Sequence, residues 1–378
     1  MLKQIRMMAA ALVVLSSACM RAPPEGPRPE PRPGEEPRPG EEVPEPRRPE
    51  APLRIGLIVS NTGSSVLEQY ADLVADGVRV AEEAASTPRR DVEVIVRDDG
   101  GTVAGAEQAV RELEQEGVRV IVGPLVDEAL LAAARARSSD DVVIISPTAV
   151  SDPFGVRNAY ALNVVDTRGA EALGEFARRW SRVGVLYGRA PETARQARAF
   201  IDAYGGAGRG EVTEAAFAAG ATNVTAQITQ LREAGVEAVY FPATEREIQS
   251  ILPQLEYAGL TDVQLLGNES WVGDAARRAP ERVLQGAIIS TPLHEDSPDV
   301  AWQDFVSRYE AMHRRSLTNP VPALGYDAAT LALHALTSGN SSVTDFRGAT
   351  GVLSLQSGTV TRRPFLVRID GGRLVPIS

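Results

Sequence analysis

The sequence of 378 residues contains a single lysine, Lys3, and a single cysteine, Cys19. Both lie close to the N-terminus, so the rest of the chain can form no disulfide within itself. It also offers no cysteine nucleophile and no lysine for a phosphate-binding loop. The three histidines lack the spacing of a metal-binding motif. We expect ordinary surface or half-buried positions for His294, His313 and His334.

The motifs of common enzyme classes are also missing. The sequence has no GxSxG nucleophile elbow, no HExxH and no CxxC. Carboxylates are frequent, but none belongs to a recognisable acid–base pair. We therefore expect a protein that is not an enzyme and that carries no cofactor. The net charge of −11, the aromatic content of 5% and the lack of basic runs argue against nucleic acid as a partner.

The first 18 residues read as a signal peptide, with a short basic start and an apolar run too short to span a bilayer. The sole cysteine follows the small residues SSA, and this arrangement resembles the lipobox of bacterial lipoproteins, although Ser16 stands where those signals usually have leucine. The resemblance implies cleavage before Cys19, lipidation of Cys19 and, in a host with two membranes, an outer-membrane location. The alternative is a plain secretory signal with an incidental cysteine.

Residues 19–52 read as a tether between this cysteine and the folded part. The segment is rich in proline, poor in apolar residues and repeats the hexad PRPGEE at Pro31–Glu36 and Pro37–Glu42. Such a composition cannot bury enough surface to fold. In an extended polyproline II conformation it reaches on the order of 100 Å.

Short apolar runs rich in β-branched residues predict strands that are buried on both faces. The runs VRVIV at 118–122 and VVIIS at 142–146 show no polar alternation, which is typical of a parallel sheet. They alternate with helical patterns over short connections, as the strand 53–60 and the helix 66–85 do. Ligands in such sheets lie beyond the carboxyl ends of the strands, so the loops GPLVDE and SPTAVSD are candidate ligand loops.

The folded part also repeats itself. The segment Arg54–Ser60 returns as Arg182–Gly188, and Ala106–Pro124 returns as Thr225–Ala243, with Leu, Gly and Pro at matching positions. An internal duplication of this kind predicts two similar α/β lobes with a ligand between them.

These motifs, together with the later GYDAATLALHAL, resemble type I periplasmic solute-binding proteins, in particular the leucine/isoleucine/valine-binding branch that serves ABC importers. The resemblance covers residues 53–378. It implies two doubly wound parallel-sheet lobes joined by three hinge crossings, near Asp166, Thr291 and Arg347. We accordingly assign the lobes as 53–166 plus 292–346 for lobe 1 and 167–291 plus 347–378 for lobe 2.

The same resemblance implies a set of ligand-binding positions. In the family, a Ser in the GPLVDE loop and a Thr with backbone groups in the SPTAV loop hold a ligand carboxylate, while a Glu shielded by Tyr holds the ammonium. Here Asp127 falls near the Ser position and Val150 replaces the Thr, which disfavours a free α-amino acid. The candidate ligand-binding residues are Tyr70, Asp127, Ser146, Thr148, Ala149, Thr244, Glu269 and Trp271.

Two of these assignments have structural alternatives. Ser146 and Thr148 could donate to a ligand or cap the turn that follows them. Glu269 and Trp271 could together hold a cationic ligand, or could be an exposed loop acid beside a core tryptophan.

Two functions stay open. The first is a lipid-anchored receptor that captures a small polar solute, such as an amino acid, for an ABC permease. The second is a regulator that has kept the fold but lost the ligand, because the segment from Phe346 to Ile377 resembles the end of lipoprotein activators of penicillin-binding proteins, which act on peptidoglycan synthesis from the outer membrane.

Overall fold

The computed structural model describes residues 50–163, 167–205, 210–260, 262–272, 281–291 and 297–377. The predicted signal peptide, the predicted lipidation site Cys19 and all but the last residues of the predicted tether lie outside these ranges. In the described part, no helix combines the length and apolar character needed to cross a bilayer.

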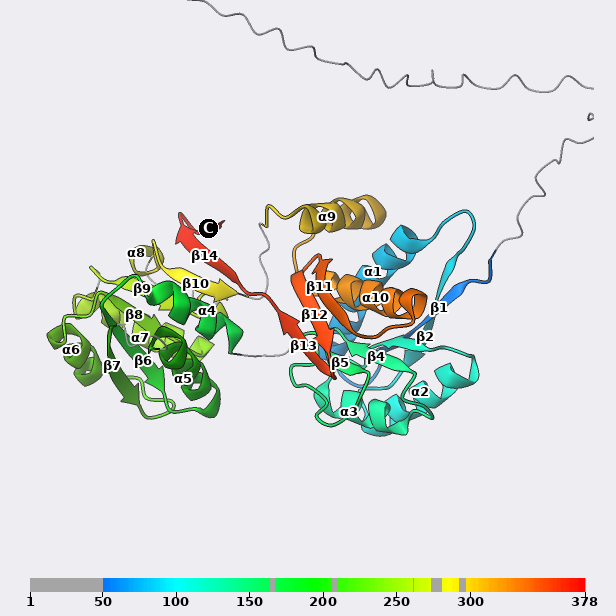
Figure 1. Cartoon of the computed structure of the whole chain (residues 1–378), viewed down its shortest axis with the longest axis horizontal. Coiled ribbons are helices and arrows are strands. Elements are labelled where there is room, and N and C mark those ends of the chain that lie inside the picture. The colour runs from blue at the N-terminus through cyan, green and yellow to red at the C-terminus, as the bar shows by residue number, and fades with distance from the viewer. Residues whose placement is uncertain are drawn as a thin grey trace, which may run out of the picture. The chain divides into compact units, whose positions relative to one another are not determined.

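The first half of the fold is a sheet of five parallel strands covered on both faces by helices (Figure 1). The strand order is β2–β1–β3–β4–β5, with β1 Leu53–Val59, β2 Val92–Asp98, β3 Val120–Val122, β4 Val143–Ser146 and β5 Ala159–Ala161. One face carries α1 Ser65–Ala85, α9 Val300–His313 and α10 Val321–Ser338, and the other carries α2 Val103–Gln115 and α3 Asp127–Ala136.

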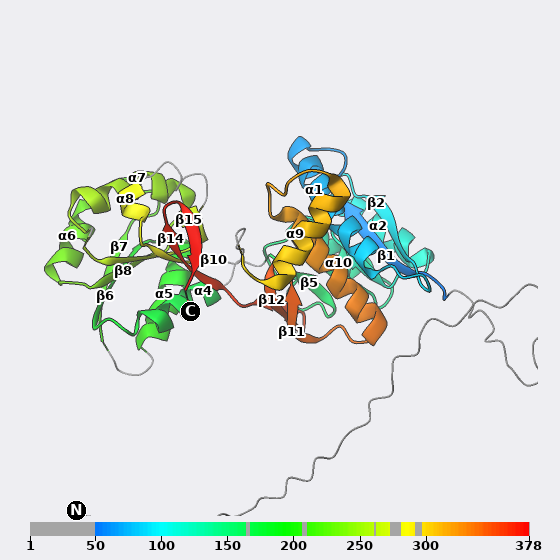
Figure 2. The ribbon, with the colours of Figure 1, turned by 90° about the horizontal axis from the view of Figure 1, so that it is seen from above.

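The second half is a sheet of seven strands, again between two helical layers (Figure 2). Its order is β15–β14–β10–β9–β8–β6–β7, with β6 Arg182–Gly188, β7 Glu211–Phe217, β8 Ala238–Phe241, β9 Gln264–Gly267, β10 Ile288–Thr291, β14 Phe365–Asp370 and β15 Arg373–Pro376. The helices are α4 Arg168–Ala177 and α5 Pro191–Gly205 on one face, and α6 Thr225–Glu233, α7 Glu245–Tyr257 and α8 Glu281–Leu284 on the other, with the 3₁₀ turn η1 at Glu269–Val272.

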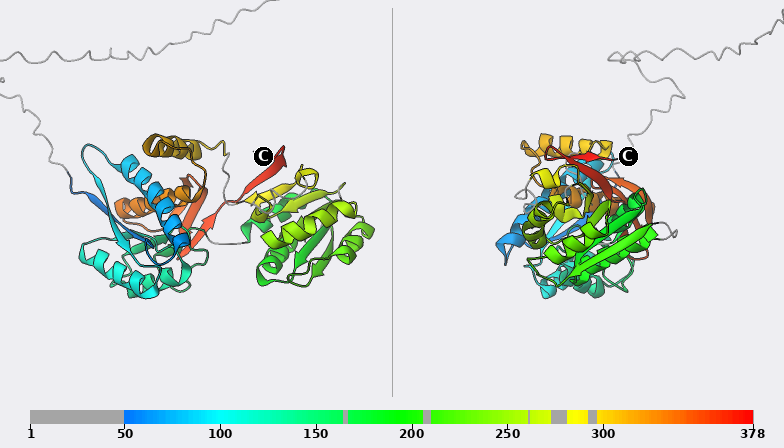
Figure 3. Two further views of the ribbon diagram at one scale, coloured as in Figure 1. Left: turned by 180° about the vertical axis from the view of Figure 1, so that it is seen from behind. Right: turned by 90° about the vertical axis from the view of Figure 1, so that its left-hand side faces the viewer.

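The last two strands form an antiparallel hairpin in which β14 runs against the direction of β10. Strand β14 pairs antiparallel with β10, and β15 pairs antiparallel with β14, so the C-terminal hairpin (red in Figure 3) extends the second sheet beyond β10. The five strands β6–β10 remain parallel, so their carboxyl ends share one edge.

The buried strands explain why the sequence forms this architecture. All residues of β3 and β4 are buried, as expected for strands that have helices on both faces. The helices are amphipathic; in α1, the buried Val74, Val78 and Ala81 recur at helical spacing and face the first core. The prediction of two similar doubly wound halves is confirmed.

The sequence repeat corresponds to a repeat in packing. A Cβ atom on Gly56 of β1 would lie 2.6 Å from Leu113 Cδ1, and a Cβ atom on Gly184 of β6 would lie 2.7 Å from Leu231 Cδ2. In each half, therefore, a leucine from a helix packs directly against a glycine of the strand, and the two leucines occupy matching positions of the repeat. Strands β1 and β6 also occupy the same place in their sheets, each between the strand that follows it and the next.

A third, antiparallel sheet corrects the predicted lobe limits. Strands β11 Val343–Gly348, β12 Gly351–Gln356 and β13 Thr359–Arg362 place Leu353 and Val360 in the hydrophobic core of the first half. The guanidinium of Arg362 donates to the Leu162 carbonyl oxygen at 2.9 Å.

The third crossing therefore lies between β13 and β14, not near Arg347, and residues 347–362 belong with the first half. The alternating apolar residues of β12 would suit either half, so the sequence pattern did not fix the position of this crossing. The predicted crossing at Asp166 lies outside the described residues. The predicted crossing at Thr291 coincides with the end of β10, and the residues after it, 292–296, are also outside the described ranges.

Candidate functional site

The loops after β3 and β4 are joined by side-chain hydrogen bonds at the carboxyl edge of the first sheet. The Ser146 hydroxyl donates to the Pro124 carbonyl oxygen and accepts from the Ala149 amide at 3.1 Å. The Thr148 hydroxyl donates to the Leu125 carbonyl oxygen at 2.7 Å. Ser146 and Ala149 are buried. The two hydroxyl groups therefore hold the loops together, in agreement with the turn-capping alternative for Ser146.

Asp127 makes a further link between the same two loops. It is the first residue of α3, and its Oδ1 accepts from the Val150 amide at 2.8 Å and from the Ser151 amide at 3.3 Å. A carboxylate at a helix N-terminus is also favoured by the helix dipole. The position that the family resemblance gives to a ligand-binding serine is thus occupied by an acid that binds backbone donors of its own chain.

The loops after β1 and β2 carry two adjacent acids in different environments. Burial alone would raise the pKa of Asp98, but hydrogen bonds from the Gly100 amide, the Thr62 hydroxyl and the Asn61 amide lower it below its ordinary value. The neighbouring Asp99 is 2% exposed, and burial raises its pKa despite a hydrogen bond of 2.6 Å from Ser60.

Exposed apolar side chains collect along this edge. Val66 and Tyr70 lie in the first turns of α1, which follows β1, and are 60% and 42% exposed. Val103 begins α2, which follows β2, and Val150 and Phe154 lie in the segment after β4, with Phe154 94% exposed. Solvent-exposed apolar side chains that gather at one edge of a fold are typical of a binding surface.

The carboxyl edge of the second sheet holds a buried amide network. Asn268, which follows β9, donates through Nδ2 to Gln196 Oε1 and to the Ala243 carbonyl oxygen, both at 3.0 Å. Its Oδ1 accepts from the Ala243 amide at 3.3 Å. Both Asn268 and Gln196 are buried, so this network fixes the ends of β8 and β9 against α5.

Thr244 caps α7 in the same region. Its hydroxyl accepts from the Glu247 amide at 3.3 Å, and the Glu247 carboxylate accepts in return from the Thr244 amide at 2.8 Å, which completes a capping box. The Thr244 side chain is thereby engaged in helix formation.

Trp271 and Glu269 have different environments although both lie in η1. Trp271 is 1% exposed, donates through Nε1 to the Phe241 carbonyl oxygen at 3.0 Å and meets the Phe241 ring edge-on. It is a core residue of the second half. Glu269 is half-buried, and its charge adds to burial in raising the pKa of Tyr240.

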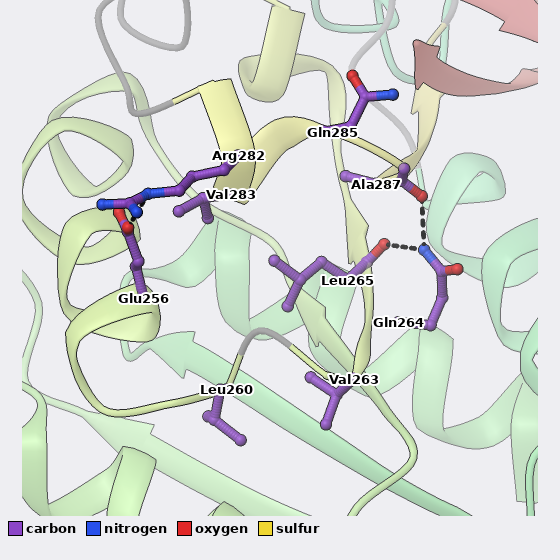
Figure 4. Close-up of a pocket in the computed structure, with 10 residues that line it drawn as sticks. Glu256, Leu260, Val263, Gln264, Leu265, Arg282, Val283, Gln285 and Ala287 are labelled. Atoms are coloured by element: carbon purple, nitrogen blue, oxygen red, sulfur yellow. Dashed lines mark hydrogen bonds and ion pairs between the residues drawn. The ribbon is translucent and has the colours of Figure 1, made fainter.

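A pocket lies at the opposite, amino edge of the second sheet (Figure 4). It is lined by Glu256 and Arg282, which form an ion pair, and by Gln264, which donates to the Gly286 carbonyl oxygen at 2.8 Å. None of the candidate ligand residues lines this pocket. Within the described ranges, no cluster of His, Cys, Asp or Glu could hold a metal ion.

The first-half candidates Tyr70, Asp127, Ser146, Thr148 and Ala149 share the carboxyl edge of the first sheet, and Thr244 and Glu269 share that of the second. Sequence reasoning missed Asn268, Gln196 and the pair Ser60–Asp99. In the motif GNESW, the charged Glu269 was the evident candidate. No sequence pattern distinguishes the neighbouring Asn268 as a buried residue.

Comparison with known proteins identifies the family. Residues 52–363, nearly all of the described part, match the model of the periplasmic binding protein family. The chain belongs to this family. Its members are binding proteins, which agrees with the prediction that the chain is not an enzyme.

Curated relatives cover part of this binding protein. It is 25% identical over 227 residues to a Leu/Ile/Val-binding protein homolog 3 of Brucella melitensis, which is 57% of this chain and 61% of that protein. It is 23% identical over 201 residues to the Leu/Ile/Val-binding protein BraC3 of Rhizobium johnstonii, which is 50% of this chain and 54% of that protein. The matched regions thus span about half to three fifths of these relatives.

A solved structure shares the fold over a greater length. The crystal structure of a putative branched-chain amino acid ABC transporter from Rhodospirillum rubrum matches with a TM-score of 0.75 at 18% identity, over 86% of this chain and 100% of the other. The type I periplasmic binding protein fold predicted from the sequence is confirmed by this match.

Proposed function

We propose that this periplasmic binding protein captures a small solute between its two halves and delivers it to the permease of an ABC importer. The observation that carries the proposal is a family match over a duplicated architecture, in which the parallel strands of two sheets end in polar loops. Ligands of open α/β sheets bind beyond the carboxyl ends of the strands. Connections between two such halves are the usual hinges of domain closure.

The exposed side chains at the carboxyl edges are the best candidates for contact with the solute. Tyr70 is exposed on the first half, and Glu269 supplies a carboxylate on the second. We assign Ser146, Thr148, Ala149 and Thr244 a supporting role, because their polar groups already bind the loops or the helix that carries them. Trp271 supports η1 from the core.

The names of the relatives bear on the size of the solute. Both curated relatives are named as Leu/Ile/Val-binding proteins, which favours a solute about the size of an amino acid. The family favours a periplasmic location.

We further propose that Cys19 is lipidated and that the proline-rich segment after it tethers the protein to a membrane, in a two-membrane host the outer one. The sole cysteine directly after a small-residue cleavage site supports this. Metabolic labelling with a palmitate analogue tests it. We expect label on the wild type and none on Cys19→Ala; label on neither protein would contradict lipidation.

One observation favours a second function, the ligand-free regulator of a penicillin-binding protein. The hydroxyl groups of Ser146 and Thr148 and the Val150 amide are all engaged within the chain, as they would be in a fold that had lost its ligand. A long tether from the outer membrane toward the cell wall would also suit that role.

A thermal-shift screen separates the two functions. The probes are amino acids, amides, amines, aromatic acids, sugars and short peptides, each in excess. A ligand at about 100 times its Kd adds about 2.7 kcal/mol to the free energy of unfolding. A saturable shift, abolished by Tyr70→Ala or Glu269→Ala, is the expected result. No shift with any probe, together with capture of a purified peptidoglycan synthase, would contradict the receptor function.

A further inference from the structure

We propose that Asp127 sets the charge specificity of the first-half site: the solute presents an amine and an apolar body to it, and no free carboxylate. This inference rests on the proposed solute-binding function and names the class of solute. It follows from the hydrogen bonds of the loops after β3 and β4, from the charges along the carboxyl edge and from the apolar side chains exposed there.

The hydrogen-bond donors in the loop after β4 are engaged within the protein. The Ala149 amide donates to the Ser146 hydroxyl, and the Val150 and Ser151 amides donate to Asp127 Oδ1. The hydroxyl groups of Ser146 and Thr148 donate to main-chain carbonyl oxygens. A ligand carboxylate needs N–H or O–H donors, and each of these donors already has an acceptor within the protein.

The loops at the carboxyl edge of the first sheet carry acids and no bases. The loops that follow β1, β2, β3 and β4, residues 60–65, 99–102, 123–127 and 147–156, contain no lysine and no arginine. They contain Asp99, Asp127 and Asp152, and Asp98 ends β2 beside them. Arg157 comes directly after the last of these loops. It forms an ion pair with Asp140, which precedes β4, so its side chain points toward the amino edge of the sheet. Asp99 is buried, but an anionic solute would meet Asp98, Asp127 and Asp152, with no basic side chain in these loops to offset them.

The loop amides bind only one of the two carboxylate oxygens of Asp127. Both of its hydrogen bonds go to Oδ1, which fixes the orientation of the carboxylate. The residue is only half-buried, so Oδ2 can accept from a solute. A primary ammonium is the matching donor, since a charge-assisted hydrogen bond to a carboxylate is stronger than a neutral one. The Asp127 carboxylate thus repels an anionic solute and binds a cationic one.

Apolar side chains are exposed at the same edge as Asp127. Val150 and Phe154 lie in the loop that Asp127 binds, and Val66 and Tyr70 lie on the first turns of α1 at the same edge. These side chains suit an aliphatic or aromatic body attached to the amine. The solute class is therefore an apolar primary amine.

Matched probes test the proposal on the full chain. Leucine and phenylalanine are compared with 3-methylbutylamine and 2-phenylethylamine, which have the same bodies without the carboxylate. We expect isothermal titration to give the amines at least about tenfold lower Kd than the amino acids, because both carry the ammonium but only the amino acids bring a carboxylate that finds no donor beside Asp127.

Three variants assign the effect to Asp127. Asp127→Asn keeps an acceptor for the two amides but removes the charge, and should abolish the preference for amines. Asp127→Ser frees the Val150 and Ser151 amides and should reverse the preference. Glu128→Gln, which changes the exposed acid next in the same helix, should keep it. Circular dichroism and the thermal midpoint show that each variant is folded.

The outcomes separate this inference from the function on which it depends. If the wild type binds amino acids as tightly as amines, or if none of the four probes binds it while another solute of the screen does, the inference is wrong and the receptor function stands. If no solute of any class binds, the receptor function fails as well.

Discussion

The carboxylate of Asp127 accepts a hydrogen bond of 2.8 Å from the amide of Val150, although the two residues belong to different strand connections. The loop after β3 thereby supplies the acceptor that the loop after β4 needs. A position that the family resemblance marks for ligand binding is used here to join two loops of the protein. This contact explains why an acid at residue 127 is compatible with the fold, and the proposed preference for amines is built on it.

Loss of the Ser146 hydroxyl should destabilise the fold. Ser146→Ala leaves the Ala149 amide and the Pro124 carbonyl oxygen without their partner in a buried environment. We expect a loss of about 2 kcal/mol in the free energy of unfolding, measured by urea denaturation. Ser64→Ala is the matched control, because Ser64 is exposed and makes no capping bond, and it should change stability by less than about 0.5 kcal/mol. Equal effects of the two changes would contradict the role given to Ser146.

The amide of Asn268 should matter as much in the second half. Asn268→Ala removes three hydrogen bonds, to Gln196 and to both main-chain groups of Ala243, from a buried position. We expect a loss of about 2–3 kcal/mol, because the partners stay buried. Asn61→Ala, at an exposed position whose amide rather than side chain binds Asp98, is the control. An unchanged free energy of unfolding for Asn268→Ala would contradict this and would show that water replaces the three lost hydrogen bonds.

Thr244 provides a test that separates stability from binding. Thr244→Ala breaks the capping box of α7 and should lower stability by about 1 kcal/mol. The affinity for any solute found in the screen should stay the same, because the Thr244 hydroxyl is engaged with Glu247. Weaker binding without a loss of stability would mean that the hydroxyl contacts the solute.

Asp99 should make part of the stability depend on pH. Burial raises its pKa in the folded chain above the ordinary value of 3.8, so the folded state binds a proton more readily than the unfolded state does. The stabilising effect is fully present below pH 3.8 and is lost as the pH rises through the folded pKa. We therefore expect Asp99→Asn to gain stability relative to the wild type as the pH rises from 3.8 toward neutrality, as measured by denaturation at a series of pH values. A difference that does not vary with pH would contradict this.

The sequence predicted the architecture well because its signals are local or repeated. The buried runs at 118–122 and 142–146 became β3 and β4, and the repeat that pairs Leu113 with Leu231 corresponds to the same glycine–leucine contact in both halves. The crossing predicted near Arg347 was wrong, because the alternating residues of β12 are equally compatible with either core.

The candidate site was predictable only in part. The strand ends and the loops after them follow from the pattern of buried strands. The partners of Ser146, Thr148 and Asp127 do not, because each contact joins residues more than twenty positions apart in the sequence. Burial was equally hard to predict for Trp271. Its position two residues after Glu269 favoured a ligand role, whereas its ring belongs to the core of the second half.

The central claim, that the two halves close on a solute, is tested most directly by energy transfer between dyes on each half. The absence of cysteine beyond Cys19 allows clean labelling of Gln108→Cys on α2 and Glu233→Cys on α6, both exposed, in a chain that lacks Cys19. If the halves close on the solute, transfer efficiency should change saturably, with a midpoint equal to the Kd from calorimetry. Binding without any change in transfer, or no binding by any solute of the screen, would contradict it.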